Sequence, residues 1–205
     1  MAIKQNKSEV RDRILKVAHE LFISKGYSGT SIRDIASSSS TNIAHVNYYF
    51  GSKAKLFEII FDESFEILVK KVFDNLNSDQ PFLSMIENWV DIYYDLLPKY
   101  PQIPMFILNE ISNGSDAIVE KIIKKNPQKI VDRLCERMEA EIKAGTIRPI
   151  PALDLGLNVL SLCVFPFMFK GFTMKIANFT SNEYNLLIKE HKKYVIDFLI
   201  RALKT

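Results

Sequence analysis

The sequence is poor in the residues that cross-link or interrupt small folds. Two cysteines, Cys135 and Cys163, occur among 205 residues, together with seven glycines and eight prolines. Two cysteines are too few for a disulfide framework, and we expect both to be inert thiols in apolar helices. No stretch of about 18 uncharged apolar residues is present, so no transmembrane helix is predicted. The charged start, MAIKQNKSEVRDRILK, lacks the apolar segment of a secretory signal. We therefore expect a cytoplasmic location and no membrane partner.

Motifs that carry catalysis or hold a cofactor are also missing. The three histidines, His19, His45 and His191, are scattered along the chain. The sequence has no HExxH or GxSxG motif, no Glu-x-x-His pair and no glycine-rich phosphate loop. A small all-α enzyme is the rival from another functional class, but it would need such a constellation. We therefore expect no enzymatic activity, no cofactor and no metal site.

Positive charge is concentrated at the N-terminal end of the chain. Residues 1–55 carry nine Lys or Arg and four Asp or Glu, whereas the remaining 150 residues carry 18 basic and 20 acidic groups. A basic module joined to a near-neutral body favours a polyanionic partner at one end. On charge alone, a slightly basic solvated surface is the alternative.

Apolar residues recur at helical spacing almost throughout, and no alternating strand pattern occurs. This periodicity predicts an all-α fold with about nine helices. A long helix should run to about Leu76, Pro127 should kink the region 115–144, and the segments LLPKYPQIP and AGTIRPIP should be loops. The apolar segment LDLGLNVLSLCVFPFMFKGF predicts a buried helix bent at Pro166, and TSNE predicts the capping box of a last amphipathic helix.

Three shorter helices are predicted before the long one. The first runs from Ser8 to a stop at Gly26, the second is capped by Thr30 or Ser31, and Asn42 caps the third, which ends at Gly51. About four residues separate the second and third helices. This length suits a helix-turn-helix, in which the second helix of the pair lies in the DNA major groove.

The third helix has the composition of a recognition helix. Val46 and Phe50 anchor it inward, and its other positions carry amide, imidazole and phenol groups that suit base edges and phosphates. These groups belong to Asn42, His45, Asn47, Tyr48 and Tyr49.

The segments TSIRDIA (30–36) and NYYFGSKAKLF (47–57) resemble the signature of the TetR family of bacterial repressors. The preceding amphipathic helix and the late AGTIRP loop agree with this resemblance. It implies an all-α homodimer with a DNA-binding domain at residues 8–68, whose motif spans 31–50. It also implies a ligand-binding and dimerisation domain at residues 69–205.

The chain departs from the family pattern at three positions. Ser40 and Thr41 stand where the turn usually has glycine and valine, so Ser40 must adopt the turn without the freedom of glycine. Asn47 stands where tyrosine is commonest. We expect these departures to affect operator choice more than the fold. They also leave room for an interaction protein that keeps the fold without binding DNA.

The resemblance implies a role for each position of the motif. Ile43, Ala44 and His45 would face base edges, residues 47–49 would reach phosphates or groove walls, and Lys53 would meet the DNA backbone as a point charge. The expected DNA contacts are Thr30, Ser31, Arg33, Asn42, Ile43, Ala44, His45, Asn47, Tyr48, Tyr49 and Lys53. Three of these have alternative roles: Tyr49 in the core, Ile43 buried by the first helix, and Thr30 as a cap.

The C-terminal body should hold an apolar pocket for a small-molecule effector. Candidate lining residues are Trp89, Tyr93, Phe106, Asn109, Glu110, Met138 and Phe169. Each has ordinary core or surface packing as its alternative role. The last two long helices should form the homodimer interface as a four-helix bundle, because their apolar stripes are too large to stay exposed. We expect a repressor that leaves a palindromic operator when a hydrophobic molecule binds.

Overall fold

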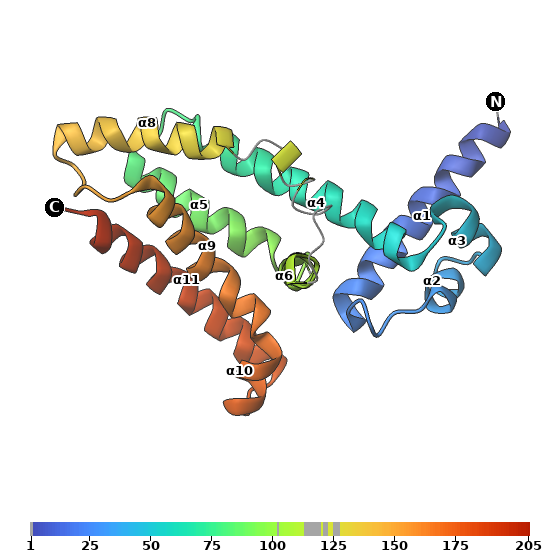
Figure 1. Ribbon diagram of the computed structural model, residues 1–205. Coiled ribbons are helices and arrows are strands. Elements are labelled where there is room, and N and C mark those ends of the chain that lie inside the picture. The colour runs from blue at the N-terminus through green and yellow to red at the C-terminus, as the bar shows by residue number, and fades with distance from the viewer. Residues whose placement is uncertain (1, 102, 113–119, 121–122, 125–127) are drawn as a thin grey trace. The chain divides into compact units, whose positions relative to one another are not determined.

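The computed structural model of the chain describes residues 2–101, 103–112, 120, 123–124 and 128–205. Its helices (Figure 1) are α1 (Ala2–Lys25), α2 (Ile32–Ser38), α3 (Ile43–Phe50), α4 (Lys53–Leu76), α5 (Phe82–Leu96), α6 (Ile103–Ser112), α8 (Gln128–Ala144), α9 (Ala152–Met168), α10 (Lys170–Ile176) and α11 (Ser181–Leu203). The described residues contain these ten helices and no β-strand, which confirms the all-α prediction. Pro127, where a kink is predicted, lies outside the described residues.

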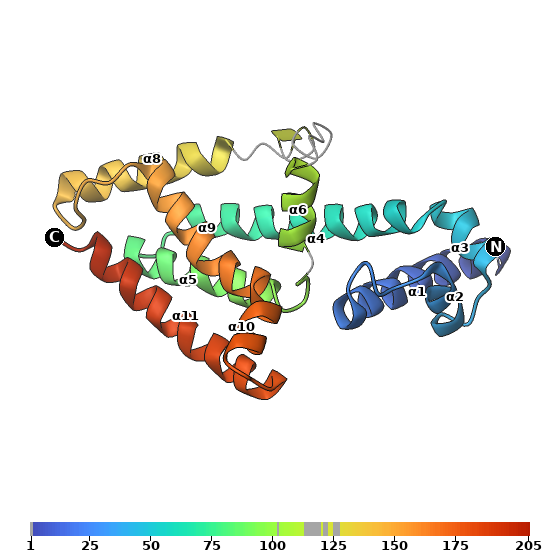
Figure 2. The same cartoon turned by 60° about the horizontal axis from the view of Figure 1, so that its bottom comes forward.

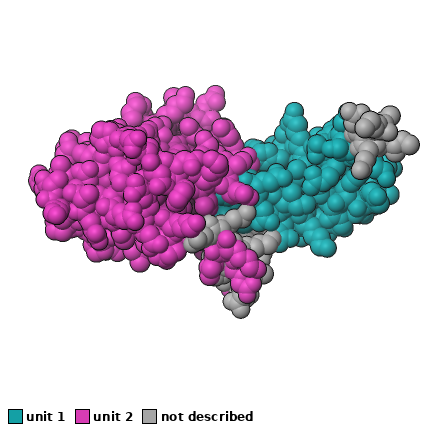
Figure 3. Space-filling view, turned by 90° about the horizontal axis from the view of Figure 1, so that it is seen from above, with its two compact units in different colours: residues 1–65 teal, residues 66–205 magenta. Residues whose placement is uncertain are grey.

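The chain forms two compact units, residues 1–65 and residues 66–205 (Figure 3). Helix α4 begins in the first unit and ends in the second, so it contributes residues to both. Each unit has its own buried core.

The first unit is built around α1, α2 and α3, with the start of α4. Local signals set the helix ends: Ser31 and Asp34 form a capping box at α2, and the Asn42 side chain accepts the backbone N–H of His45 at α3. Gly51 ends α3 with φ of 74°, a conformation that favours glycine. The buried apolar side chains of this unit are Ile14, Ala18, Phe22, Ile35, Ala36, Val46, Phe50, Leu56, Phe57, Ile60 and Phe61.

In the second unit, α5 packs against α9 and α11, and α8 packs against α9. Figure 2 shows α9 and α11 running side by side, with α10 at the end opposite the C-terminus. The inward face of α5 supplies much of the core, including Met85, Ile86, Trp89, Val90 and Tyr93. The predicted AGTIRPIP loop contains Ile147, which forms an isolated bridge with Lys204 and so ties this loop to the end of α11.

The apolar segment is divided into two helices shortly after Pro166, close to the predicted bend. Proline lacks the N–H that would continue the helical hydrogen bonding. Helix α9 ends at Met168, and α10 follows at an angle of 61°. Within the described residues no single helix has the length and apolarity to cross a membrane, and this bent pair meets that test on length and composition only.

The sequence predicts that this apolar helix is buried on all sides, and for α9 in a single chain this prediction was wrong. Leu155, Val159 and Cys163 are buried on one face, whereas Leu157 and Phe165 on the other face are more than half exposed. An apolar composition indicates that a helix is buried, but it does not say whether its own chain or another molecule covers it.

Candidate nucleic-acid interface

The turn between α2 and α3 is held together by hydroxyl groups. Ser40 adopts φ of 52°, so a serine occupies the left-handed position where glycine is usual. The buried Ser39 hydroxyl lies 2.6 Å from the Ile35 carbonyl oxygen and 2.9 Å from the Thr41 hydroxyl. The backbone N–H of Thr41 donates to the Ala36 carbonyl oxygen at 2.9 Å. These bonds fix the turn without glycine and account for the Ser40–Thr41 departure.

Helix α1 supports this turn from a distance in sequence. The Arg13 guanidinium Nε donates to the Ser39 carbonyl oxygen at 2.9 Å. The Arg11 guanidinium carbon lies 5.5 Å from the centroid of the Phe50 ring, within cation–π range. Two arginines of α1 are therefore used to hold the helix-turn-helix, and sequence reasoning had not assigned either role.

Helix α3 has one buried face and one exposed face. Val46 is fully buried and Phe50 is 4% exposed, so both predicted anchors lie in the core. The exposed side chains are Asn42, Ile43, Ala44, His45, Asn47 and Tyr48. Ile43 is 41% exposed, so α1 does not bury it, and Tyr48 is 71% exposed. Tyr49 is half-buried, with its ring in contact with the Tyr48 ring at a centroid distance of 5.1 Å.

The hydroxyls of Thr30 and Ser31 already have partners within the protein. Thr30 is 1% exposed, and its hydroxyl lies 2.8 Å from the Gly26 carbonyl oxygen at the end of α1. The Ser31 hydroxyl donates to the Asp34 carboxylate at 2.6 Å. Hydrogen bonds from the hydroxyl and backbone N–H of Ser31 hold the pKa of Asp34 below its ordinary value of 3.8, so this carboxylate stays negative. Arg33 is exposed on the same short helix.

Lys53 joins the start of α4 to the loop between α1 and α2. Its ammonium Nζ donates to the carbonyl oxygens of Tyr27 at 3.0 Å and Thr30 at 3.1 Å. It also lies 4.1 Å from the centroid of the Tyr27 ring. An ammonium has three donors, so one N–H is available to a further acceptor such as a phosphate. The sequence analysis assigns no role to Tyr27. The local signal that places Tyr27 in a loop is Gly26, which directly precedes it.

The candidate effector residues divide into three groups. Trp89, Tyr93 and Met138 are buried together in the core of the second unit. Phe169, at the end of α9, is 40% exposed, so the structure does not bring it to this group. The side chains of Phe106, Asn109 and Glu110 lie outside the described part of the chain.

The environment of the buried group disfavours charge. Burial raises the pKa of the Tyr93 hydroxyl, and it raises the pKa of the Cys163 thiol to about 12. The indole Nε1 of Trp89 is buried and makes no hydrogen bond to the described residues. Among those residues, no group of three or more His, Cys, Asp or Glu side chains is placed to hold a metal ion.

The helix-turn-helix segment matches a known family. Residues 14–60 match the family of bacterial regulatory proteins described as tetR. This segment includes the second half of α1, all of α2 and α3, and the start of α4.

Two bacterial regulators are similar over most of the chain. The "Probable HTH-type transcriptional regulator YttP" of Bacillus subtilis (strain 168) is 27% identical over 198 residues, which cover 92% of this chain and 93% of that protein. The "HTH-type transcriptional repressor NicS" of Pseudomonas putida is 27% identical over 165 residues, 78% of this chain and 77% of that protein.

Solved structures show the same fold. The ketosteroid transcriptional regulator KstR2 of Mycobacterium tuberculosis superposes with a TM-score of 0.68 at 14% identity. The superposition covers 95% of each chain, so both units have the fold seen in that regulator.

Proposed function

Because this chain belongs to the TetR family of bacterial regulatory proteins, we propose that it is a homodimeric repressor of a near-palindromic operator. In this proposal a small hydrophobic molecule binds the second unit and releases the DNA. The observation that carries the proposal is the exposed face of α3, where amide, imidazole and phenol groups surround two buried anchors, Val46 and Phe50.

Base recognition is assigned to the first turn of α3. Ile43, Ala44 and His45 are exposed there, at the end of the recognition helix that contacts base edges in helix-turn-helix proteins. The imidazole of His45 can donate or accept a hydrogen bond in the major groove, and Ile43 can pack against a thymine methyl group.

Phosphate contacts are assigned to groups around this turn. Asn42, Asn47 and Tyr48 are exposed, the half-buried Tyr49 lies beside Tyr48, and Lys53 has its third N–H available. At α2, the exposed Arg33 and the backbone amides of Thr30 and Ser31 are better suited to a phosphate than the two hydroxyls, because both hydroxyls have partners. These contacts fix position on the DNA and carry little sequence information.

The homodimer is assigned to α9 and α11. Their uncovered apolar side chains include Leu153, Leu157, Leu160, Phe165, Leu186 and Phe198. A groove of about 530 Å³ on this face is lined by residues of both helices, among them Leu162, His191 and Phe198. An exposed apolar surface of this extent is typical of a protein interface, and a second copy would complete a four-helix bundle.

An effector site is assigned to the core beside Trp89, Tyr93 and Met138. These side chains offer a mainly apolar surface with an indole N–H and a phenol, the composition of a small-molecule site. The raised pKa of Tyr93 favours a neutral effector over an ion. Effector binding would shift α4, which belongs to both units, and would change the spacing of the two recognition helices, about 34–36 Å in such dimers. The name of NicS supports repression as the sign of regulation.

Selection of bound duplexes from a random DNA pool tests the proposal. We expect inverted repeats whose half-sites lie about one helical turn apart. His45→Ala should relax the preference at one position of each half-site by about 1–3 kcal/mol, because one base contact is lost. Its thermal unfolding should not change, since the exposed imidazole contributes no cap and Asn42 accepts the backbone N–H. Binding without any sequence preference would favour an interaction protein that has kept the fold.

A further inference from the structure

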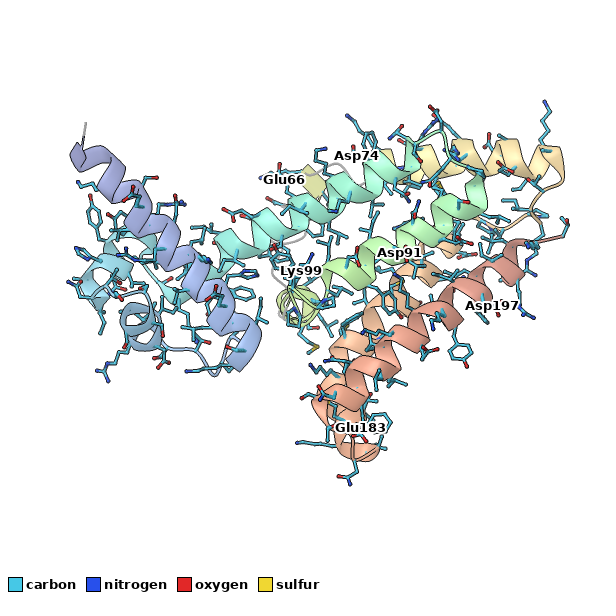
Figure 4. All side chains as sticks on the ribbon, turned by 180° about the vertical axis from the view of Figure 1, so that it is seen from behind. Glu66, Asp74, Asp91, Lys99, Glu183 and Asp197 are labelled. Carbon is cyan, nitrogen blue, oxygen red and sulfur yellow. The ribbon has the colours of Figure 1, made fainter. Side chains whose placement is uncertain are left out.

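The C-terminal end of α4 lies in a network of polar contacts. Asp74, labelled in Figure 4, marks the last turn of this helix, and residues 77–81 connect it to α5. One guanidinium group donates hydrogen bonds to the backbone carbonyl oxygens of Leu76, the last residue of α4, and of Ser78 and Gln80 in the connection. That group belongs to Arg137 of α8, which lies about 60 residues further along the chain.

Arg137 makes three hydrogen bonds with these carbonyl groups. Its Nη1 donates to Ser78 at 2.6 Å and to Leu76 at 3.3 Å, and its Nη2 donates to Gln80 at 2.7 Å. The planar guanidinium has donors on both terminal nitrogens, which suit these three carbonyl oxygens. The ammonium of a lysine would not reproduce this arrangement of hydrogen bonds. The side chain is partly buried, which strengthens such bonds relative to water.

The contacts of Arg137 complete the C-terminal end of α4. The last carbonyl groups of a helix have no partners within the helix, and a positive charge near them is favourable. The last turn of α4 contains no basic residue. The backbone N–H groups of Asn77 and Ser78 donate to the carbonyl oxygens of Phe73 and Asn75. Arg137 adds from α8 a donor for the Leu76 carbonyl oxygen and the positive charge that this helix end lacks.

The same helix end is also attached to α5. Asn75 is 8% exposed, and its amide Nδ2 donates to the Met85 carbonyl oxygen at 2.9 Å. Its Oδ1 accepts the amide of Gln80 at 2.7 Å, and Gln80 in turn accepts the amide of Asn88. The end of α4 is thus fixed to both α5 and α8 by directional bonds.

We propose that Arg137 is a positioning residue for DNA recognition, which fixes the end of α4 to α8 and so holds the two recognition helices of the dimer at one spacing. This inference rests on the proposed function, because it assumes that α3 reads an operator and that two copies act together. Met138 follows Arg137 on α8 and lies in the core where the effector site is proposed. The hydrogen bonds of Arg137 would therefore transmit a displacement of α8 to α4.

Loss of the Arg137 hydrogen bonds should affect binding to paired half-sites only. A single half-site is read by one first unit, which contains neither Arg137 nor its hydrogen-bond partners. Binding to a palindrome needs both recognition helices at the correct separation. The affinity for a palindrome therefore depends on how firmly α4 is held. Loosening these hydrogen bonds should therefore weaken paired binding and leave single-site binding unchanged.

The test measures the affinity of the full-length protein for three kinds of duplex, made from the operator that the wild type selects. These are the palindrome, the palindrome with its centre lengthened or shortened by one or two base pairs, and a single half-site. For Arg137→Met we expect a loss of roughly tenfold on the palindrome, a typical size for a coupling between sites. The dependence on spacing should become flatter, and half-site affinity should stay within about twofold of the wild type.

Two further variants make the test specific. Arg133→Met is the matched control, because Arg133 lies one turn earlier on α8 and its ion pair, to Glu136 at 2.8 Å, stays within that helix. It should bind like the wild type. Arg137→Lys keeps the charge without the fork, should give an intermediate spacing profile, and replaces Arg137→Met if that variant does not fold.

The outcomes separate the two proposals. A wild type without sequence-specific binding overturns the proposed function, and the positioning role falls with it. If the wild type binds but the Arg137 variants keep its sharp spacing profile, or lose affinity equally for palindrome and half-site, the positioning role is wrong and the proposed function stands.

Discussion

The ammonium of Lys53 donates to the carbonyl oxygen of Tyr27 at 3.0 Å and lies 4.1 Å from the centroid of the ring of the same residue, 26 positions earlier in the chain. One tyrosine thus holds the lysine through both its backbone and its π face. The interaction places a positive charge at the start of α4, beside the loop between α1 and α2. The residue expected to meet a phosphate is oriented by the fold before any DNA is present, which lowers the entropy cost of that contact.

Replacing Lys53 should therefore affect both stability and DNA binding. Lys53→Ala should lower the free energy of unfolding by about 1–3 kcal/mol, because two carbonyl groups lose a charged donor. It should weaken binding to all duplexes alike and lower the salt slope by about 1. Chemical denaturation and binding titrations at several salt concentrations measure the two effects. Lys55→Ala, at an exposed position two residues later, is the control for stability. An unchanged unfolding curve for Lys53→Ala would show that its hydrogen bonds contribute little.

Ser40 offers a test of backbone strain in the turn. A left-handed conformation costs an L-residue roughly 1–2 kcal/mol relative to glycine. Ser40→Gly should remove this cost and raise the melting temperature, although the greater entropy of glycine in the unfolded chain offsets part of the gain. The matched control is Ser38→Gly, at the last residue of α2, where glycine should destabilise the helix. Equal shifts for the two variants would mean that the Ser40 conformation is not strained.

The capping box of α2 should make stability depend on pH. The folded-state pKa of Asp34 lies below its ordinary value of 3.8, so the carboxylate stabilises the fold above that value, and this stabilisation is lost as pH falls through the lower pKa. Asp34→Asn removes the charge. We expect the difference in unfolding free energy between wild type and variant to be constant near neutral pH and to shrink below about pH 4. Urea denaturation over a pH series measures it. A difference that persists unchanged in acid would assign the effect to shape and not to charge.

The exposed apolar face of α9 and α11 predicts a change in assembly. Phe198 is 61% exposed, so Phe198→Asp should leave the fold of one chain intact and place two charges in the proposed dimer interface. Sedimentation velocity should show a monomer for this variant and a dimer for the wild type. Leu108→Asp, at a 45% exposed position on α6, is the control and should remain dimeric. A dimeric Phe198→Asp variant would place the interface elsewhere.

The parts of the fold that depend on local chemistry could be predicted from sequence. Asn42 and Gly51 bound α3 as expected, and Val46 and Phe50 are buried, because caps and helical spacing act over a few residues. Ser31, and not Thr30, caps α2, while the Thr30 hydroxyl turns back to the end of α1. Both residues suit a cap, and only the path of the loop decides between them.

Contacts between distant segments could not be predicted. Neither the Tyr27 carbonyl beneath Lys53 nor the Leu76, Ser78 and Gln80 carbonyls around Arg137 has a sequence signature, since every residue has a carbonyl group. The exposed half of α9 was missed for a related reason. Helical periodicity reports that Leu157 and Phe165 are apolar, and it contains no information about which molecule covers them.

The hydroxyl-bonded turn before α3 has a consequence for how such a protein can diverge. The described bonds of Ser39 and Thr41 lead back to α2, and Arg13 of α1 donates to the Ser39 carbonyl oxygen. None of them uses an exposed side chain of α3. Under the proposed function, substitutions at Ile43, Ala44, His45 or Asn47 would therefore change which DNA is read without disturbing the framework that presents it. In that case the surface that contacts bases could vary while the turn that positions α3 stays the same, so gene duplicates of this protein would acquire new operators through few mutations.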